Sequence, residues 1–333
     1  MNKSTRYNLG IIGVGGLAER RILPALASSE DFEVSCIFDI DPKRLEYIAG
    51  AFSIPKQVSS PDRFFSEHLD AVYIATPNYA HVPYAIEALK HDMAVLIEKP
   101  CAISSTSAEE LLQAAKRAKR PALVAYMSKL NRYNQAVLGF VREKRIGKLL
   151  AMTASYGFCY NDMNAWRMHR DKSGPGALAD IGVYAITTAL DLFDEMPVSC
   201  SAQAFPAGNP VFGDRFLSGR IEFSGGRWLQ VTASFVSPSH GYTLVGTSGV
   251  IHAEQTWGQD GKGEITICTE QGLEKIVSEE VNPYEEEFRC LKECLDGHPV
   301  PGNMSIERGA QDVKVMEALD RSAAQMGKET MIL

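Results

Sequence analysis

The chain has 333 residues, of which 45% are hydrophobic and 23% charged, and its formal net charge is −7 at pH 7. This composition is typical of a folded protein with roughly two domains and excludes a disordered chain. The acidic balance disfavours a nucleic-acid binder, and we expect no membrane span because no apolar run approaches the necessary length. The seven cysteines are scattered and predict neither a disulfide framework nor a metal site, which indicates a reduced, cytoplasmic protein.

The first 126 residues alternate short β-branched runs with helical patterns. Strands are predicted at residues 7–12, 32–38, 70–75, 94–97 and 122–126, and helices up to about residue 27, from residue 42, at 82–90 and at 107–119. Such alternation is typical of βαβ units and of a parallel sheet covered on both faces. We therefore predict a doubly wound α/β domain over residues 1–126.

The pattern changes after residue 126. Helices are predicted near 132–144, 176–193, 284–295 and 305–326, and strands at 148–158, 215–223, 227–235, 242–247, 250–254 and 264–268. Successive strands without helices between them indicate a mostly antiparallel sheet. Residues 127–333 are therefore predicted to form an α+β domain.

A glycine-rich turn lies between the first strand and the first helix. Gly13-Val14-Gly15-Gly16-Leu17-Ala18 fits the pattern G-x-G-x-x-A, and this context is typical of a dinucleotide-binding turn. Gly13 permits the tight turn, Gly15 lets a pyrophosphate approach the backbone, and Ala18 is small where the helix meets the strand. The alternative is a purely structural turn.

An acidic residue at the end of the second strand bears on the choice of dinucleotide. Asp39 follows Ala18 by 21 residues, where a carboxylate can bind the hydroxyls of an adenosine ribose, and this favours NAD. Lys43 and Arg44 follow closely and leave NADP open.

A second set of polar residues follows later strands of the same predicted sheet. Glu98-Lys99-Pro100 comes directly after the strand at 94–97, and Thr76, Asn78 and His81 follow the strand at 70–75. Ligands of open parallel sheets collect beyond the carboxyl ends of the strands, which places these residues beside the glycine turn. Adjacent charges such as Glu98 and Lys99 are also common as a solvated pair, and a lone histidine is more often a helix-start residue.

Combined, these motifs resemble the Gfo/Idh/MocA family, named for glucose-fructose oxidoreductase, inositol dehydrogenase and a rhizopine-catabolism protein. The similarity covers essentially the whole chain. It includes the glycine turn, Ala75-Thr76-Pro77-Asn78 with His81, Glu98-Lys99-Pro100, Trp166-Arg167, the segment Gly174 to Tyr184, Leu244 to Gly249, and the closing stretch from Glu286 to Ser322.

The resemblance implies a nicotinamide-dependent oxidoreductase with a Rossmann domain and a second domain built on a large open sheet. It implies that Lys99, Asp180 and Tyr184 are catalytic, and that Trp166 and Arg167 fold toward cofactor and substrate. Many family members have histidine where this chain has Tyr184, and tyrosine resembles the glucose-fructose oxidoreductase and the dihydrodiol or xylose dehydrogenase branches. A phenol is a poor base at neutral pH, and a neighbouring ammonium group such as that of Lys99 would improve it.

The expected sites can be stated together. Cofactor contacts are expected from Gly13, Gly15, Gly16, Leu17, Ala18, Asp39, Arg44, Thr76, Pro77, Asn78, His81, Glu98, Lys99, Trp166 and Arg167. Substrate contacts are expected from Lys99, Lys129, Tyr160, Arg167, Asp180 and Tyr184. The expected substrate is a sugar, cyclitol or related polyol, and the expected assembly is a homodimer or homotetramer through the C-terminal sheet. A non-catalytic cofactor sensor, a dihydrodiol dehydrogenase and a tetrapyrrole reductase stay open as alternatives.

Overall fold

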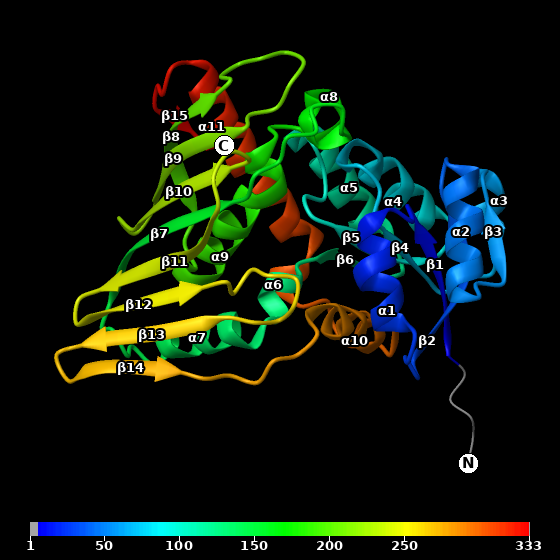
Figure 1. The fold of residues 1–333 in the computed structure, drawn as a ribbon, viewed down its shortest axis with the longest axis horizontal. Coiled ribbons are helices and arrows are strands. Elements are labelled where there is room, and N and C mark those ends of the chain that lie inside the picture. Colours follow the sequence, from blue (N-terminus) through cyan, green and yellow to red (C-terminus); the bar gives the residue numbers. More distant parts are fainter. Residues whose placement is uncertain (1–5, 333) are drawn as a thin grey trace. The chain divides into compact units, whose positions relative to one another are not determined.

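The computed structural model describes residues 6–332, which form two compact units (Figure 1). The first unit comprises the residues up to 102, 106–126 and 284–310, and the second comprises 103–105, 127–283 and the residues from 311 on. The sequence-based division had assigned residues 284–310 to the second domain. They belong to the first unit because Phe288 packs its ring against those of Phe32 and Tyr73, with centroids 5.9 and 5.6 Å away.

The first unit is built on a six-stranded parallel sheet with the order β3-β2-β1-β4-β5-β6. The strands are β1 (Tyr7–Ile12), β2 (Phe32–Phe38), β3 (Lys56–Val58), β4 (Ala71–Ile74), β5 (Ala94–Glu98) and β6 (Ala122–Ala125). Every residue of β4 and β6 is buried, as expected for a sheet covered on both faces. The chain leaves β1 toward β2 on one side and later returns to β4 on the other, so a topological switch point lies between β1 and β4.

The helices of the first unit connect these strands. They are a π-helical turn (Ala18–Ile22) running into α1 (Leu23–Leu26), α2 (Pro42–Phe52), α3 (Pro61–Phe65), α4 (His81–Lys90), α5 (Ser105–Arg117) and α10 (Pro283–Leu295). Asp41 caps α2 by accepting from the backbone N–H groups of Lys43 and Arg44, and Pro42 occupies the first helical position. The sequence analysis missed β3 and α3, which are three and five residues long and too short to show a period.

The second unit is built on a nine-stranded sheet with the order β14-β13-β12-β11-β7-β10-β9-β8-β15. The strands are β7 (Leu149–Gly157), β8 (Pro197–Phe205), β9 (Phe216–Phe223), β10 (Trp228–Ser234), β11 (Ser239–Gly246), β12 (Gly249–Glu254), β13 (Glu264–Thr269), β14 (Gly272–Ile276) and β15 (Thr330–Met331). All neighbours are antiparallel except β7 and β10, which are parallel. The predicted fold class is therefore confirmed, although β8, β14 and β15 were not predicted.

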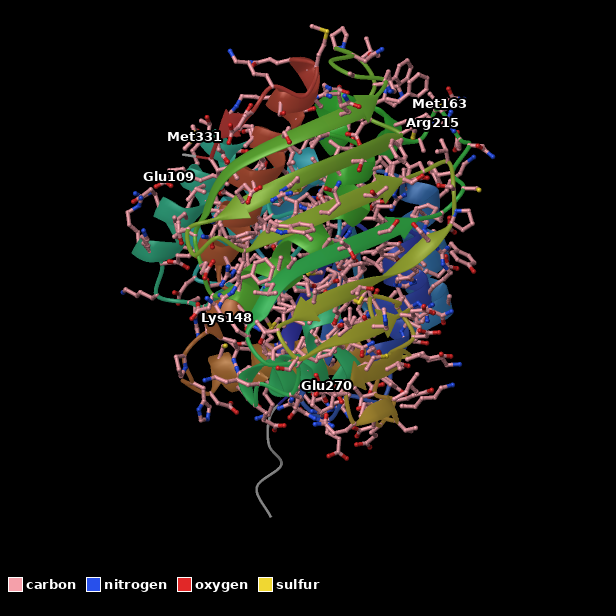
Figure 2. All side chains as sticks on the ribbon, turned by 90° about the vertical axis from the view of Figure 1, so that its left-hand side faces the viewer. Glu109, Lys148, Met163, Arg215, Glu270 and Met331 are labelled. Carbon is pink, nitrogen blue, oxygen red and sulfur yellow. The ribbon has the colours of Figure 1, made fainter. Side chains whose placement is uncertain are left out.

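The second unit also contains helices, some of which cover one face of its sheet. They are α6 (Met127–Leu130), α7 (Arg132–Arg142), α8 (Arg170–Ser173), a π-helical turn (Leu178–Gly182) continuing as α9 (Val183–Phe193), and α11 (Ile306–Ala324). α9 packs on β7 and β10, and α7 packs on β12 and β13. Figure 2 views the opposite face, where the strands lie in front and, within the described residues, no helix covers them.

The segment before α9 differs from the single helix predicted over 176–193. Gly174 and Gly176 adopt positive φ angles of 80° and 58°, which separates α8 from the π-helical turn. The stretch Arg170–Phe193 is the one helical region among the described residues that is long and apolar enough to cross a membrane, contrary to our expectation of none. Because 83% of its most apolar stretch is buried in the protein, this region has the character of a core helix. Its length and composition are therefore weak evidence for a membrane span.

Candidate active site

The glycine turn has the geometry that a dinucleotide pyrophosphate requires. Gly13 has a φ of 87°, and a Cβ atom there would lie 2.7 Å from the carbonyl oxygen of Ala75. A Cβ atom at Gly15 would meet nothing within 4 Å, so the space above the turn is open, and Ala18 is fully buried. The turn therefore has a close-packed base and an exposed backbone, which fits NAD.

Asp39 is joined to this turn by a hydrogen bond. Its Oδ2 accepts from the backbone N–H of Val14 at 2.9 Å, and its Oδ1 accepts from the N–H of Asp41 at 3.0 Å. The carboxylate thus lies where β1 and β2 end, which is the place for ribose hydroxyls. Gly16 and Leu17 begin the helical segment, and a Cβ atom at Gly16 would lie 2.7 Å from the Arg20 guanidinium group. Arg20 was not among the expected cofactor contacts.

The loops after β4 and β5 are tied together by His81. Its ring nitrogens lie 2.8 and 2.9 Å from the carbonyl oxygens of Pro100 and Thr76, and the side chain is 1% exposed. Burial lowers the pKa of His81 to about 4, although the two carbonyl bonds act in the opposite direction. We had expected this histidine to contact the cofactor, but its ring is engaged by the two loops. Pro77 and Asn78 lie in the same turn, and Asn78 is buried.

The residues around Lys99 form a partly buried acidic cluster. The Glu98 carboxylate accepts from the Tyr73 hydroxyl at 2.5 Å and from the backbone N–H of Lys99 at 3.2 Å. Glu287 of α10 is fully buried, and burial, followed by the charge of Glu98, raises its pKa well above the ordinary value. Glu98 therefore points into the first unit, while Lys99 lies directly beyond the end of β5. Glu287 could not be predicted from local pattern, because α10 begins 185 residues after the end of β5.

In the second unit, four of the predicted site residues come together around one guanidinium group. The Nε atom of Arg167 donates to Oδ2 of Asp180 at 3.1 Å. The Arg167 Cζ lies 4.9 Å from the ring centroid of Trp166 and 5.8 Å from that of Tyr160. The charge of Asp180 raises the pKa of Arg167. The Asp180 carboxylate and the two aromatic rings thus fix the Arg167 guanidinium group, and this group in turn orients the Asp180 carboxylate.

Tyr184 follows Asp180 by one helical turn and belongs to an aromatic stack. Its ring centroid lies 5.7 Å from that of Tyr156, and the residue is 6% exposed. On Tyr156, the ring of His240 is stacked at 4.3 Å, and Trp257 lies 6.0 Å from Tyr156. Burial, followed by the charges of Asp180 and Asp260, raises the pKa of Tyr156 to about 12. We did not predict His240 and Trp257, since nothing local in the sequence places β11 beside β7.

The start of the helix that carries these residues is held by Asp214. The backbone N–H of Ala177 donates to the Asp214 carbonyl oxygen at 2.9 Å, and that of Leu178 donates to Oδ2 at 3.2 Å. A Cβ atom at Gly176 would lie 2.2 Å from the same carbonyl oxygen, so only glycine fits there. Burial, followed by the charge of Asp320, raises the pKa of Asp214 to about 7.

Lys129 lies in a different environment from the other expected substrate contacts. Its Nζ is 3.1 Å from Oδ2 of Asp191, and the two side chains are only 4% and 14% exposed. The pair joins α6 to α9 in the second unit, where a buried ion pair orients the two helices. Within the described residues, no group of three or more His, Cys, Asp or Glu side chains could hold a metal ion.

The fold and the glycine turn define a class of protein, one with a dinucleotide-binding Rossmann domain. Comparison with protein families agrees. The model of the oxidoreductase family with an NAD-binding Rossmann fold matches residues 7–126, and that of the GFO/IDH/MocA C-terminal domain matches residues 135–252. The chain belongs to the Gfo/Idh/MocA oxidoreductase family.

Individual relatives span nearly the whole chain. An uncharacterized oxidoreductase of Rhizobium meliloti is 28% identical over 97% of this chain and 98% of its own. The D-xylose 1-dehydrogenase [NADP(+)] of Haloarcula marismortui is 26% identical over 93% and 89%. The crystal structure of aldose-aldose oxidoreductase from Caulobacter crescentus, complexed with glycerol, has a TM-score of 0.90 at 24% identity and covers 98% of this chain and 100% of that one. This last similarity concerns the fold.

Proposed function

We propose that this chain transfers a hydride between a nicotinamide cofactor and a carbinol or carbonyl carbon of a sugar, cyclitol or related polyol. The observation that carries the proposal is the arrangement in the second unit, where Asp180 and Tyr184 lie one turn apart and Arg167 binds Asp180. A carboxylate and a phenol in an enclosed aromatic setting suit general acid–base work on a hydroxyl group. The relative from Haloarcula, named as a xylose dehydrogenase, supports a sugar-like substrate.

The proposed chemistry assigns a role to each of the chain's groups. The nicotinamide, when bound, accepts or supplies the hydride. In the oxidative direction the ionised Tyr184 Oη takes the hydroxyl proton while the electron pair of the C–H bond leaves with the hydride, so the carbinol becomes a carbonyl and Tyr184 becomes a neutral phenol. The Lys99 ammonium group stabilises the negative charge that develops on oxygen, and Asp180, fixed by Arg167, orients the substrate. Acid–base help of this kind contributes about 100- to 10,000-fold to a rate.

The proposal is tested by the rate at which the absorbance of the reduced nicotinamide changes. Purified protein is mixed with NAD or NADP and a panel of aldoses, inositols and dihydrodiols, and absorbance of the reduced cofactor is followed. Lys99→Met should lower turnover by at least 100-fold, whereas Lys116→Met, a matched change at an exposed lysine of α5, should leave it unchanged. Equal loss in both variants contradicts the role of Lys99. Tight NADH binding without turnover on any member of the panel favours the sensor alternative.

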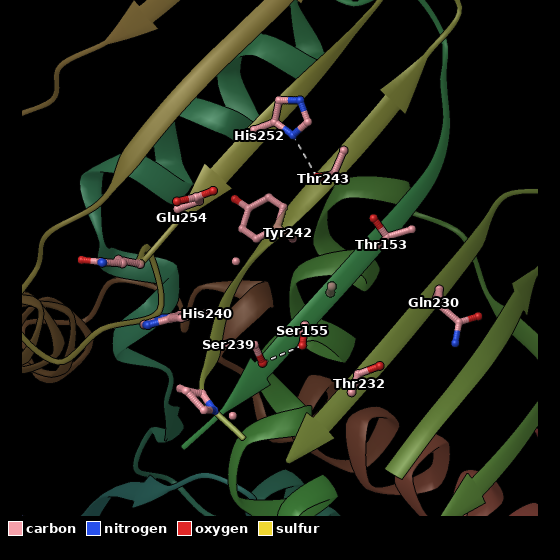
Figure 3. A pocket seen from close by; sticks show the side chains of 15 residues that line it. Thr153, Ser155, Gln230, Thr232, Ser239, His240, Tyr242, Thr243, His252 and Glu254 are labelled. Carbon is pink, nitrogen blue, oxygen red and sulfur yellow. Dashed lines mark hydrogen bonds between the residues drawn. The ribbon is translucent and has the colours of Figure 1, made fainter. Parts of the chain in front are cut away.

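We further propose that a second copy of the chain covers the outer face of the nine-stranded sheet. A hollow of about 710 Å³ lies on β7, β10, β11 and β12, and five of the fifteen residues that line it carry short hydroxyl side chains (Figure 3). Among them, Ser155 and Ser239 are hydrogen bonded at 2.6 Å, and Thr153 and Thr232 point from the same face. A light-scattering mass equal to the 36.5 kDa monomer would contradict the dimer or tetramer.

We also propose that the protein is located in the cytoplasm.

A further inference from the structure

Arg44, which lies beside the expected ribose position, is engaged by the protein itself. Arg44 of α2 donates from Nε to the carbonyl oxygen of Val14 at 2.7 Å and from Nη2 to Glu19 Oε2 at 2.7 Å. Its Cζ lies 5.6 Å from the ring centroid of Tyr47, whose hydroxyl donates to Glu19 Oε1 at 3.1 Å. The guanidinium group is therefore fixed by a carbonyl, a carboxylate and a ring.

The contacts of Arg44 and Asp39 meet on Val14, which lies between Gly13 and Gly15 in the glycine turn. Val14 is bound on its N–H by Asp39 and on its carbonyl by Arg44, so the acidic ribose site and the Arg44–Glu19 pair are adjacent. Both members of that pair are about a quarter exposed. The residue after Asp39 is Ile40, which is 79% exposed and carries no charge.

The charge at this position decides between the two nicotinamide dinucleotides. NADP carries an additional 2′-phosphate, which needs cationic donors, and an arginine near the end of the second strand commonly supplies them. Here the charge of Arg44 is balanced by Glu19, and Asp39 repels a phosphate. Lys43 is an exposed cation nearby, but its ammonium group is a strongly hydrated point charge on a flexible stem and lacks the bidentate geometry of the Arg44 guanidinium group.

We propose that Glu19 is a specificity-determining residue: by pairing with Arg44 it removes the cation that a 2′-phosphate would need, and so selects NAD. From the sequence, Asp39 favoured NAD, while Lys43 and Arg44 left NADP open. The Haloarcula relative is named for NADP(+), so the inference separates this chain from that protein. It rests on the NAD-binding domain and not on the proposed hydride transfer.

The test measures cofactor affinity by nicotinamide fluorescence on the intact chain. Glu19→Gln keeps the size of the side chain and an acceptor for Tyr47 while it removes the charge. We expect the wild type to bind NADH more tightly than NADPH. Glu19→Gln should raise the affinity for NADPH by roughly three- to tenfold and change that for NADH by less than about twofold. The gain should shrink at high salt.

Two further variants make the test specific. Glu19→Gln combined with Arg44→Met should lose the gain in the NADPH-to-NADH affinity ratio, which separates Arg44 from the neighbouring Arg20. Glu46→Gln removes an exposed carboxylate from the same helix and should leave the ratio unchanged. An unchanged ratio in Glu19→Gln, an equal gain in Glu46→Gln, or a gain that survives Arg44→Met would each overturn the inference. Because the readout is binding, a failure of the proposed hydride transfer does not affect it.

Discussion

Asp214 should make the stability of the second unit depend on pH between about 4 and 7. Its carboxyl group is 1% exposed and binds the first turn of the segment that leads into α9, and its pKa is raised from 3.8 to about 7. The folded protein thus holds this proton more tightly than the unfolded chain. The stabilisation is complete below pH 4 and is lost as the pH rises to 7.

The magnitude follows from the size of the change. One pKa unit corresponds to about 1.4 kcal/mol, so a pKa of about 7 in place of 3.8 corresponds to a loss of about 4 kcal/mol by pH 7. Asp214→Asn has nearly the same shape as the protonated acid and does not titrate. The variant should match the wild type near pH 4 and exceed its stability by an increasing amount up to pH 7. The other charged groups that face Asp214 are Arg170 and Asp320, and they are paired with each other at 2.6 and 2.9 Å.

Hydrogen exchange is the suitable assay, because two units can unfold separately and a single unfolding curve would combine them. Protection of the amides in α9 is compared between variant and wild type at each pH from 4 to 8, so the intrinsic exchange rates cancel. Asp171→Asn, at an exposed carboxylate of α8, serves as the control and should show no trend. A difference between Asp214→Asn and the wild type that is constant over this range would refute the reasoning.

Three shorter predictions concern other parts of the molecule. Because burial raises the pKa of Glu287, the carboxyl group costs more stability as the pH rises, so Glu287→Gln should protect the amides of α10 from hydrogen exchange more than the wild type does, by a margin that grows between pH 5 and 7; an equal margin at both pH values would contradict this. Arg167→Met removes the ion pair between Arg167 and Asp180 and should lower kcat/KM by roughly 10- to 100-fold, while Arg167→Lys should recover only part of it. Gly13→Ala places a Cβ atom against the Ala75 carbonyl and should abolish NADH binding in a fluorescence titration; unchanged affinity would show that the turn tolerates a side chain.

Most strands of the first unit could be predicted from the local pattern of apolar residues. Apolar runs of four to seven residues alternating with helical patterns predicted β1, β2, β4, β5 and β6, because strands buried on both faces must be almost continuously apolar. The glycine turn was equally readable, since its function depends on backbone conformation and on residues that are adjacent in the chain. Asp39 could be placed by counting because the βαβ unit has a nearly fixed length.

What required the tertiary structure is contact between distant segments. Nothing near Asp214 in the sequence indicates that it binds the N–H of Leu178. Nothing near Glu287 indicates that its carboxyl group lies close enough to Glu98 to feel its charge. The return of α10 to the first unit depends on the Phe288 ring fitting against Phe32 and Tyr73. Such contacts depend on how surfaces fit together in space, which short-range periodicity does not encode.

The same distinction applies to the charged residues of the two units. The order of residues along the chain supplies the cations Lys129, Arg44 and Arg167. The tertiary structure alone decided their partners, because Lys129 binds Asp191, Arg44 binds Glu19 and Arg167 binds Asp180. A charge acts through the groups that folding brings within about 4 Å of it, and those groups here come from 13 to 62 positions away along the chain.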